Sequence, residues 1–228
     1  MKQRYNIFKQ IHKGLRAMLY DTAINLQLTD FSNTEDAEIS LEKLNQTLAT
    51  FYEHATQEDR FILPIIARFN PSLVEEFDSE HEKDEFMSHR INSLVTAYRN
   101  SGSSDGRIEA GDAIGRAFNE FIAFNLYHMN KEEEKINPIL WENYSDEGIK
   151  EIRRTLVASI STDQVLVTSK WMMLGISDAE VTTWLQEVKN NAPVFVFQSL
   201  MELAERVLSP NRWNKIQGGL SEGVLLAS

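Results

Sequence analysis

Two stretches of sequence decide the fold of this chain: EHATQEDRFILPI at residues 53–65 and YHMNKEEEKINPI at residues 127–139. Each contains a histidine, a glutamate four residues later and a proline six residues after the glutamate, and the second stretch repeats the first after 74 residues. Residues four apart on an α-helix point to the same face, one turn apart along the axis. The repeat therefore predicts two helices that each present an imidazole and a carboxylate together.

Both histidine–glutamate pairs lie in the apolar stripe of the helix that carries them. The pairs are His54 with Glu58 and His128 with Glu132, and apolar residues recur with helical spacing on both sides of each. An ionised carboxylate on a buried face is costly unless another group compensates its charge. Neither stripe contains a lysine or an arginine at this level, so a bound cation is the simplest compensation.

Two further predicted helices contribute one inward histidine each. His12 lies 42 residues before His54, and His81 lies 47 residues before His128, so that the chain reads as two helix pairs. Breaks rich in Ser, Asn, Gly and Pro separate the four segments, which we expect at about residues 5–28, 38–69, 71–100 and 107–141. Packed antiparallel, these helices bring four imidazoles and two carboxylates to one level of a bundle, which is enough for two metal ions.

The composition excludes several other kinds of protein and site. With 23 Lys and Arg against 34 Asp and Glu, the formal net charge is -11, and such an acidic surface repels nucleic acid and anionic lipid. The chain has no cysteine, which excludes disulfides, iron–sulfur clusters and zinc–thiolate sites. No segment approaches the roughly 18 apolar residues of a membrane span, and the first residues lead into an amphipathic stretch rather than a signal peptide. We therefore expect a cytoplasmic protein with neither nucleic acid nor membrane as a partner.

Beyond the fourth predicted helix the chain changes to shorter helical stretches, with N-caps expected at Ser161 and Ser177. We therefore predict a metal-binding bundle at residues 1–144 and a small helical subdomain at residues 145–228, which ends in a loose tail from about Gly218. Three of the four tryptophans lie in this subdomain, but none of the five histidines does. The tryptophans are expected in the subdomain's core, and a surface for a protein partner is the alternative.

The spaced set of histidines and glutamates resembles the pattern of the hemerythrin-like, or HHE cation-binding, family in its bacterial form, over about residues 5–142. That pattern is a histidine, an HxxxE motif, a second histidine and a second HxxxE motif, and the proline after each glutamate is similar as well. The resemblance implies an all-α fold, an antiparallel four-helix bundle that holds two iron ions with an oxo or hydroxo bridge. It implies that the terminal ligands are His12, His54, His81 and His128, and that the bridging ligands are Glu58 and Glu132.

The sequence departs from the oxygen-carrying hemerythrins of invertebrates one turn after the third-helix histidine. Those proteins have another histidine there, and this chain has Glu85. The difference argues against reversible oxygen carriage. Glu85 is a candidate seventh ligand, with a proton relay and an ordinary solvated glutamate as alternatives. His89 is rotated off the row of His81, and we interpret it as a surface histidine or one that supports a ligand.

Nitrogen and oxygen ligands without thiolate suit iron, manganese or zinc, and two bridging carboxylates favour a redox pair of iron ions. The leading hypothesis is a di-iron protein that binds or senses dioxygen or a related small oxidant, such as nitric oxide or peroxide. The alternatives are a catalase-like or peroxidase-like enzyme that consumes peroxide, and a protein of iron storage or repair. Repair is less favoured, because iron–sulfur repair relatives usually carry a cysteine-containing N-terminal segment. Whether the protein is an enzyme stays open at this stage.

Overall fold

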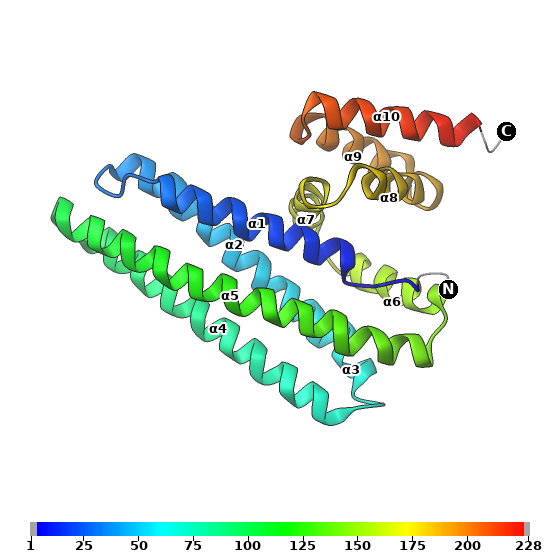
Figure 1. Ribbon diagram of the computed structural model, residues 1–228, viewed down its shortest axis with the longest axis horizontal. Helices are drawn as coiled ribbons and strands as arrows, with labels where there is room; N and C mark the ends of the chain where they lie inside the picture. The colour runs from blue at the N-terminus through cyan, green and yellow to red at the C-terminus, as the bar shows by residue number, and fades with distance from the viewer. Residues whose placement is uncertain (1–3, 226–228) are drawn as a thin grey trace. The chain divides into compact units, whose positions relative to one another are not determined.

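The computed structural model describes residues 4–225, with side chains through residue 221, and the described part of the chain is helical without a strand. Its helices are α1 (Lys9–Leu28), α2 (Thr34–Phe61), α3 (Leu63–Ile66), α4 (Pro71–Asn100), α5 (Ser104–Asn143), α6 (Asp146–Ala158), α7 (Thr162–Gly175), α8 (Asp178–Asn191), α9 (Val194–Val207) and α10 (Pro210–Leu225) (Figure 1). The predicted all-α class is confirmed. None of the described helices is long and apolar enough to cross a membrane.

Three of the four long helices begin at capping residues that the sequence provides. Asn33, Asn70 and Ser103 precede α2, α4 and α5, and the side-chain oxygen of each accepts a hydrogen bond from a backbone N–H two or three residues later. The single helix expected at residues 38–69 is interrupted, since α2 ends at Phe61 and α3 forms a separate turn. Pro64 cannot donate the helical hydrogen bond to the fourth residue before it, although α5 continues through Pro138 at the matching position of the repeat.

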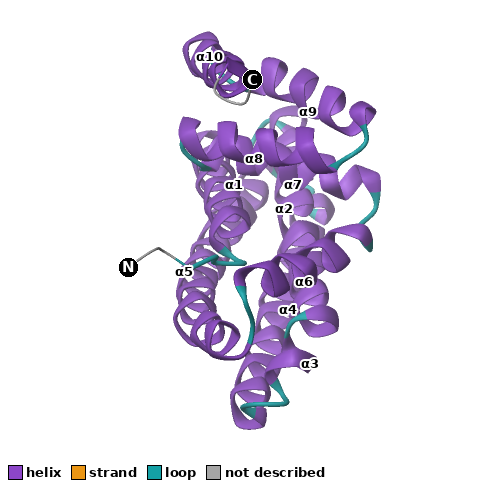
Figure 2. Ribbon diagram, turned by 90° about the vertical axis from the view of Figure 1, so that its right-hand side faces the viewer, coloured by secondary structure: helices purple, strands orange, loops and turns teal. Residues whose placement is uncertain are grey.

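The second half of α1 lies beside α2, and α4 and α5 complete an antiparallel four-helix bundle (Figures 1 and 2). Thr22 of α1 and Thr47 of α2 share a hydrogen bond of 2.8 Å. The rings of Phe51 on α2 and Phe121 on α5 meet edge to face, 5.5 Å apart. Short turns after α1 and after α4 reverse the chain direction, so the helix that follows each turn runs antiparallel to the one before it.

The phenylalanine contact lies before the predicted ligands along α2 and α5, and a buried apolar cluster lies after them. It is made by the N-terminal segment and by parts of α2 to α6, and its buried members are Ile7, Phe8, Ile62, Leu63, Ile66, Leu73, Phe77, Ile136, Leu140 and Ile149. Along α2 and α5, the predicted ligands therefore lie between the phenylalanine contact and this cluster. Apolar walls on both sides keep water away and strengthen electrostatic interactions among the polar side chains between them.

By their contacts the residues fall into two compact units. One comprises residues 4–8 and Leu19–Ser159, and the other comprises Lys9–Met18 with the residues after Ser159. Helix α6 thus belongs with the bundle, whereas the predicted boundary places it after residue 144. The boundary at 144/145 stays a prediction.

The second unit has its own core, formed by α7 to α10 around Met173, Val181, Leu185 and Ile216. Ser161 and Ser177 each make the reciprocal side-chain and backbone hydrogen bonds of a capping box, as the sequence predicts. The tryptophans Trp171, Trp184 and Trp213 are buried. They serve the core, and this arrangement does not favour a partner surface built on them.

The prediction of a loose tail from about Gly218 is wrong for most of the segment. Helix α10 continues to Leu225, and Ile216 and Leu220 are buried in the core of the second unit. Burial of these side chains explains why the segment is helical rather than loose. The last three residues of the chain lie outside the described part.

Within the same unit, two glycines allow backbones to approach closely. A Cβ atom on Gly14 would lie 2.8 Å from the backbone nitrogen of Met172, and one on Gly175 would lie 2.3 Å from the carbonyl oxygen of Lys13. Real Cβ atoms do not approach backbone atoms so closely. Both positions therefore require glycine because of packing and not because of a special backbone conformation.

Candidate metal centre

Two carboxylates occupy the middle of the bundle. Glu58 of α2 is 1% exposed and Glu132 of α5 is 0% exposed. Nε2 of His54 lies 3.1 Å from Oε1 of Glu58, in the same helix. In α5, Nε2 of His128 lies 3.3 Å from Oε1 of Glu132. Both HxxxE motifs therefore place their side chains together inside the bundle, as the helical spacing predicts.

The third-helix histidine reaches the same carboxylates from α4. Nε2 of His81 lies 3.7 Å from Oε2 of Glu58. The rings of His81 and His128 meet edge to face with centroids 5.0 Å apart. Phe77 and Phe124 contact the His128 ring from two sides, so apolar rings restrict the orientation of this imidazole.

The charges of the metal-free protein are balanced by protons. Burial raises the pKa of Glu58 well above its usual value, and the neighbouring carboxylate of Glu132 raises it further. Burial by itself would lower the pKa of His128, but the carboxylates of Glu132 and Glu80 raise it to about 10. Glu58 thus keeps its proton to a higher pH than a solvated glutamate does, and His128 is cationic at neutral pH. A divalent cation that binds among these groups replaces this positive charge.

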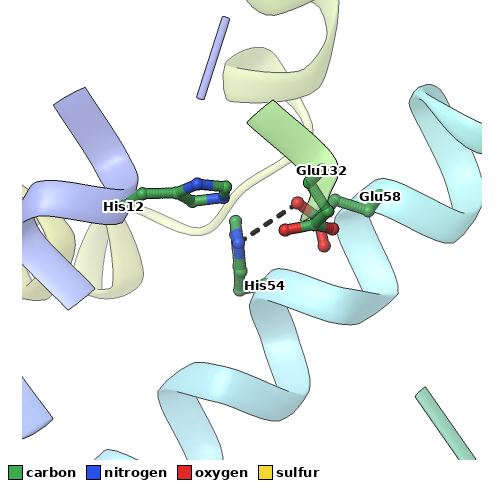
Figure 3. A group of neighbouring side chains, drawn as sticks. All are labelled: His12, His54, Glu58 and Glu132. Atoms are coloured by element: carbon green, nitrogen blue, oxygen red, sulfur yellow. Dashed lines mark ion pairs between the residues drawn. The ribbon is translucent and has the colours of Figure 1, made fainter. Parts of the chain in front are cut away.

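The predicted ligands form two groups that fit a metal ion. One group is Glu58, His81, His128 and Glu132, and the other is His12, His54, Glu58 and Glu132. Figure 3 shows the second group, with the imidazoles and both carboxylates directed toward one another. In each group the potential ligand atoms lie within 4.8 Å of one another. Metal–ligand bonds of about 2.0–2.2 Å separate opposite ligands by roughly 4.4 Å, so the spacing and the nitrogen and oxygen donors suit a metal.

Glu58 and Glu132 belong to both groups, whereas each histidine belongs to one. This sharing is the geometry expected of carboxylates that bridge two neighbouring cations. The structure thus brings together all six residues selected from the sequence. Their roles as ligands stay predictions, because proximity alone does not establish coordination.

Glu85 and His89 lie outside both groups. Glu85 is largely exposed, and its Oε1 lies 3.4 Å from Nε2 of His89, one turn further along α4. Its side chain lines a cavity of about 300 Å³ between α2 and α4, together with Tyr52, Ala55, Thr56, Asp59, Asp78, His81, Glu82 and Asp84. The placement fits an ordinary solvated glutamate or a proton relay better than a seventh ligand.

Sequence reasoning missed three carboxylates near the centre. Oδ1 of Asp59 lies 2.7 Å from Nδ1 of His81, and Oε2 of Glu80 lies 2.7 Å from Nδ1 of His128. Asp84 is buried, accepts a hydrogen bond of 2.6 Å from Asn125, and has a pKa raised by burial. Asp59 and Glu80 directly neighbour predicted ligands in sequence. That adjacency was a visible signal, but it does not tell which histidine each carboxylate reaches.

Fold and site together define a class of protein: an all-helical bundle with a buried centre of imidazoles and carboxylates suited to metal binding. The family model described as the hemerythrin HHE cation-binding domain matches residues 3–140. The chain belongs to this family. The resemblance read from the histidine and glutamate pattern is confirmed, while its bacterial form stays a prediction.

Among known proteins the chain is similar to vertebrate F-box/LRR-repeat protein 5. The protein of Salmo salar is 21% identical over 172 residues, which cover 75% of this chain and 24% of the relative. That of Mus musculus is 21% identical over 153 residues, covering 67% and 21%, and that of Pongo abelii is 23% identical over 156 residues, covering 68% and 22%. The chain therefore spans about a quarter or less of these relatives. No solved structure matches it significantly.

Proposed function

We propose that the protein holds two iron ions and that the reduced pair binds or senses dioxygen or a related small oxidant, such as nitric oxide or peroxide. The observation that carries the proposal is the presence of Glu58 and Glu132 in both potential ligand groups. Shared carboxylates hold two cations close together. Nitrogen and oxygen donors suit iron, with manganese and zinc as the alternatives.

The residues of the chain have distinct tasks in this proposal. Each of the four histidines would hold one of the two ions through a ring nitrogen, and the two glutamates would hold both. When bound, an iron pair would supply the electrons that a small oxidant accepts. Phe77 and Phe124 limit water around His128. Glu58 and His128, which hold protons without metal, release them when the cations bind.

Iron content and an optical response together test this proposal. The metal-free full chain is loaded with Fe²⁺ without oxygen, excess metal is removed, and iron per chain is measured by elemental analysis. We expect close to two ions per chain, and a spectral change on adding oxygen, nitric oxide or peroxide. One ion per chain, or none, would refute the two-metal centre. Two ions without any spectral response would leave a storage or structural role.

Peroxide consumption is a second candidate, favoured by one observation. Asp84 lines the cavity that contains His81, and burial raises the pKa of its carboxyl, so it is a suitable proton donor beside the centre. Repeated peroxide loss with oxygen evolution, abolished by His54→Ala and slowed by Asp84→Asn, would support an enzyme. Consumption of a single equivalent would support a sensor. A protein partner of the C-terminal unit remains a prediction.

A further inference from the structure

Two imidazoles at the centre are held from outside by carboxylates of neighbouring helices. Asp59 on α2 lies 2.7 Å from Nδ1 of His81 on α4. Glu80 on α4 lies 2.7 Å from Nδ1 of His128 on α5. An imidazole that donates its Nδ1 hydrogen to a carboxylate keeps the Nε2 lone pair for a metal and is fixed in orientation. In both cases Nε2 is the atom that faces the inner glutamates.

The two supports differ in how firmly they are held. Nζ of Lys131 donates to Glu80 at 2.6 Å, and the same lysine is bound by Glu76 at 2.6 Å and lies over the Phe77 ring. The Glu80 side chain is 25% exposed, whereas that of Asp59 is 46% exposed. Asp59 also lines the cavity between α2 and α4. His128 is therefore clamped inside the bundle, while His81 has a half-exposed support.

The cavity contacts the centre at His81, and of the six residues in the two ligand groups only His81 is among its lining residues. At about 300 Å³ it has room for roughly ten water molecules, each taking about 30 Å³ of liquid, and so for a hydrated divalent cation. Asp78, Glu82 and Glu85 line its wall, and carboxylates attract cations. A ligand that must move aside during metal exchange moves most easily where space and solvent adjoin it.

We propose that Asp59 is a positioning residue for His81, and that this pair forms the side of the centre through which metal ions exchange with solvent. Glu80 and Lys131 keep the neighbouring His128 fixed. This inference rests on the proposed function only in requiring that the centre binds a divalent cation. It does not depend on iron or on any reaction with oxygen.

Replacing Asp59 tests the positioning role. The full chain is loaded with Co²⁺, and its release to a strong chelator is followed by the cobalt absorption. Loss of such support typically lowers metal affinity by about 10- to 100-fold, so we expect Asp59→Ala to release Co²⁺ faster by about this factor, and Asp59→Glu to restore much of the retention. Asp78→Ala removes the same charge from the same cavity without the hydrogen bond to His81. Equal acceleration by both alanine variants would overturn the role of Asp59.

A second readout separates positioning from general weakening of the fold. Long-range ¹H–¹⁵N NMR of the metal-free protein reports which ring nitrogen of His81 carries hydrogen. We expect hydrogen at Nδ1 in the natural chain and in Asp78→Ala, and a changed His81 pattern in Asp59→Ala with unaltered helix content. An unchanged pattern in Asp59→Ala would contradict the positioning role whatever the release rate.

Narrowing the cavity tests the exchange side. Thr56 lines the cavity, and its hydroxyl bonds the carbonyl of Tyr52. Thr50, six residues earlier on α2, makes the same kind of bond to the carbonyl of Gln46. We expect Thr56→Phe to slow uptake and release of Co²⁺ by the same factor, leaving affinity unchanged, and Thr50→Phe to alter neither. Unchanged rates in Thr56→Phe would mean that exchange occurs elsewhere.

If the natural chain binds neither Co²⁺ nor Fe²⁺, this inference and the proposed function fail together. If it binds two iron ions but the variants behave alike, only the inference fails.

Discussion

Replacing Glu58 by glutamine should stabilise the metal-free protein, although it removes a predicted ligand. Glu58 is almost completely buried, and burial together with Glu132 raises its pKa well above the usual value. The folded chain therefore keeps a proton on Glu58 at pH values where the unfolded chain has lost it. Glutamine has the same shape as the protonated acid and can donate its amide hydrogen to Glu132 as that acid does.

The size and sign of the effect follow from proton linkage. The folded state binds more protons than the unfolded state above pH 4.5, so the stability of the natural chain falls as pH rises, by about 1.4 kcal/mol per pH unit for one proton. Glu58→Gln has no carboxyl at this position, so its stability does not fall with rising pH for this reason. From pH 4.5 up to the raised pKa of the folded state, its advantage should grow by at most about 1.4 kcal/mol per pH unit, or roughly 3–6 °C in Tm for a chain of this size. His128 keeps its partners Glu132 and Glu80 in the variant, so its contribution largely cancels.

Urea denaturation of metal-free protein, followed by circular dichroism at several pH values, measures the effect. Glu134→Gln, an exposed glutamate of the same helix, is the matched control and should change stability by less than about 0.5 kcal/mol. Below pH 4.5 the advantage of Glu58→Gln should vanish. A variant that is less stable than the natural chain at neutral pH, by an amount independent of pH, would refute the assignment of a buried, protonated Glu58.

Three other outcomes are expected. Glu132→Ala or Glu58→Ala should lower metal content per chain, measured by elemental analysis, far more than Glu133→Ala or His89→Ala; equal losses in all four would contradict the assigned faces. Loading the metal-free protein with a divalent cation near neutral pH should release protons into a weak buffer that contains an indicator, and metal affinity should rise with pH. The reason is that the metal displaces the protons of His128, which has a pKa of about 10, and of Glu58, whose pKa is raised by burial. Binding without proton release would show that these groups do not meet the metal. Gly14→Ala should lower the free energy of unfolding by about 1–3 kcal/mol, since its Cβ would lie 2.8 Å from the backbone nitrogen of Met172, whereas Gly102→Ala, whose Cβ would meet no atom within 4 Å, should have little effect in the same urea titration.

The sequence by itself determined which helices form the bundle and which faces turn inward. Helical periodicity is a local property, so the four-residue spacing of His54 and Glu58, repeated at His128 and Glu132, specifies a shared face without knowledge of the neighbours. Because the two carboxylates are buried, only a few kinds of partner can compensate their negative charge. Fold class and the six predicted ligands follow from these two arguments.

The tertiary structure alone decided which side chains from different helices meet. Asp59 pairs with His81, and Glu80 pairs with His128, across helix interfaces. These pairings depend on the axial offset and rotation of one helix against another, which packing of the whole core sets and the period of a single helix does not contain. The same reason explains Glu85, which follows His81 by one turn yet faces the cavity rather than the two carboxylates.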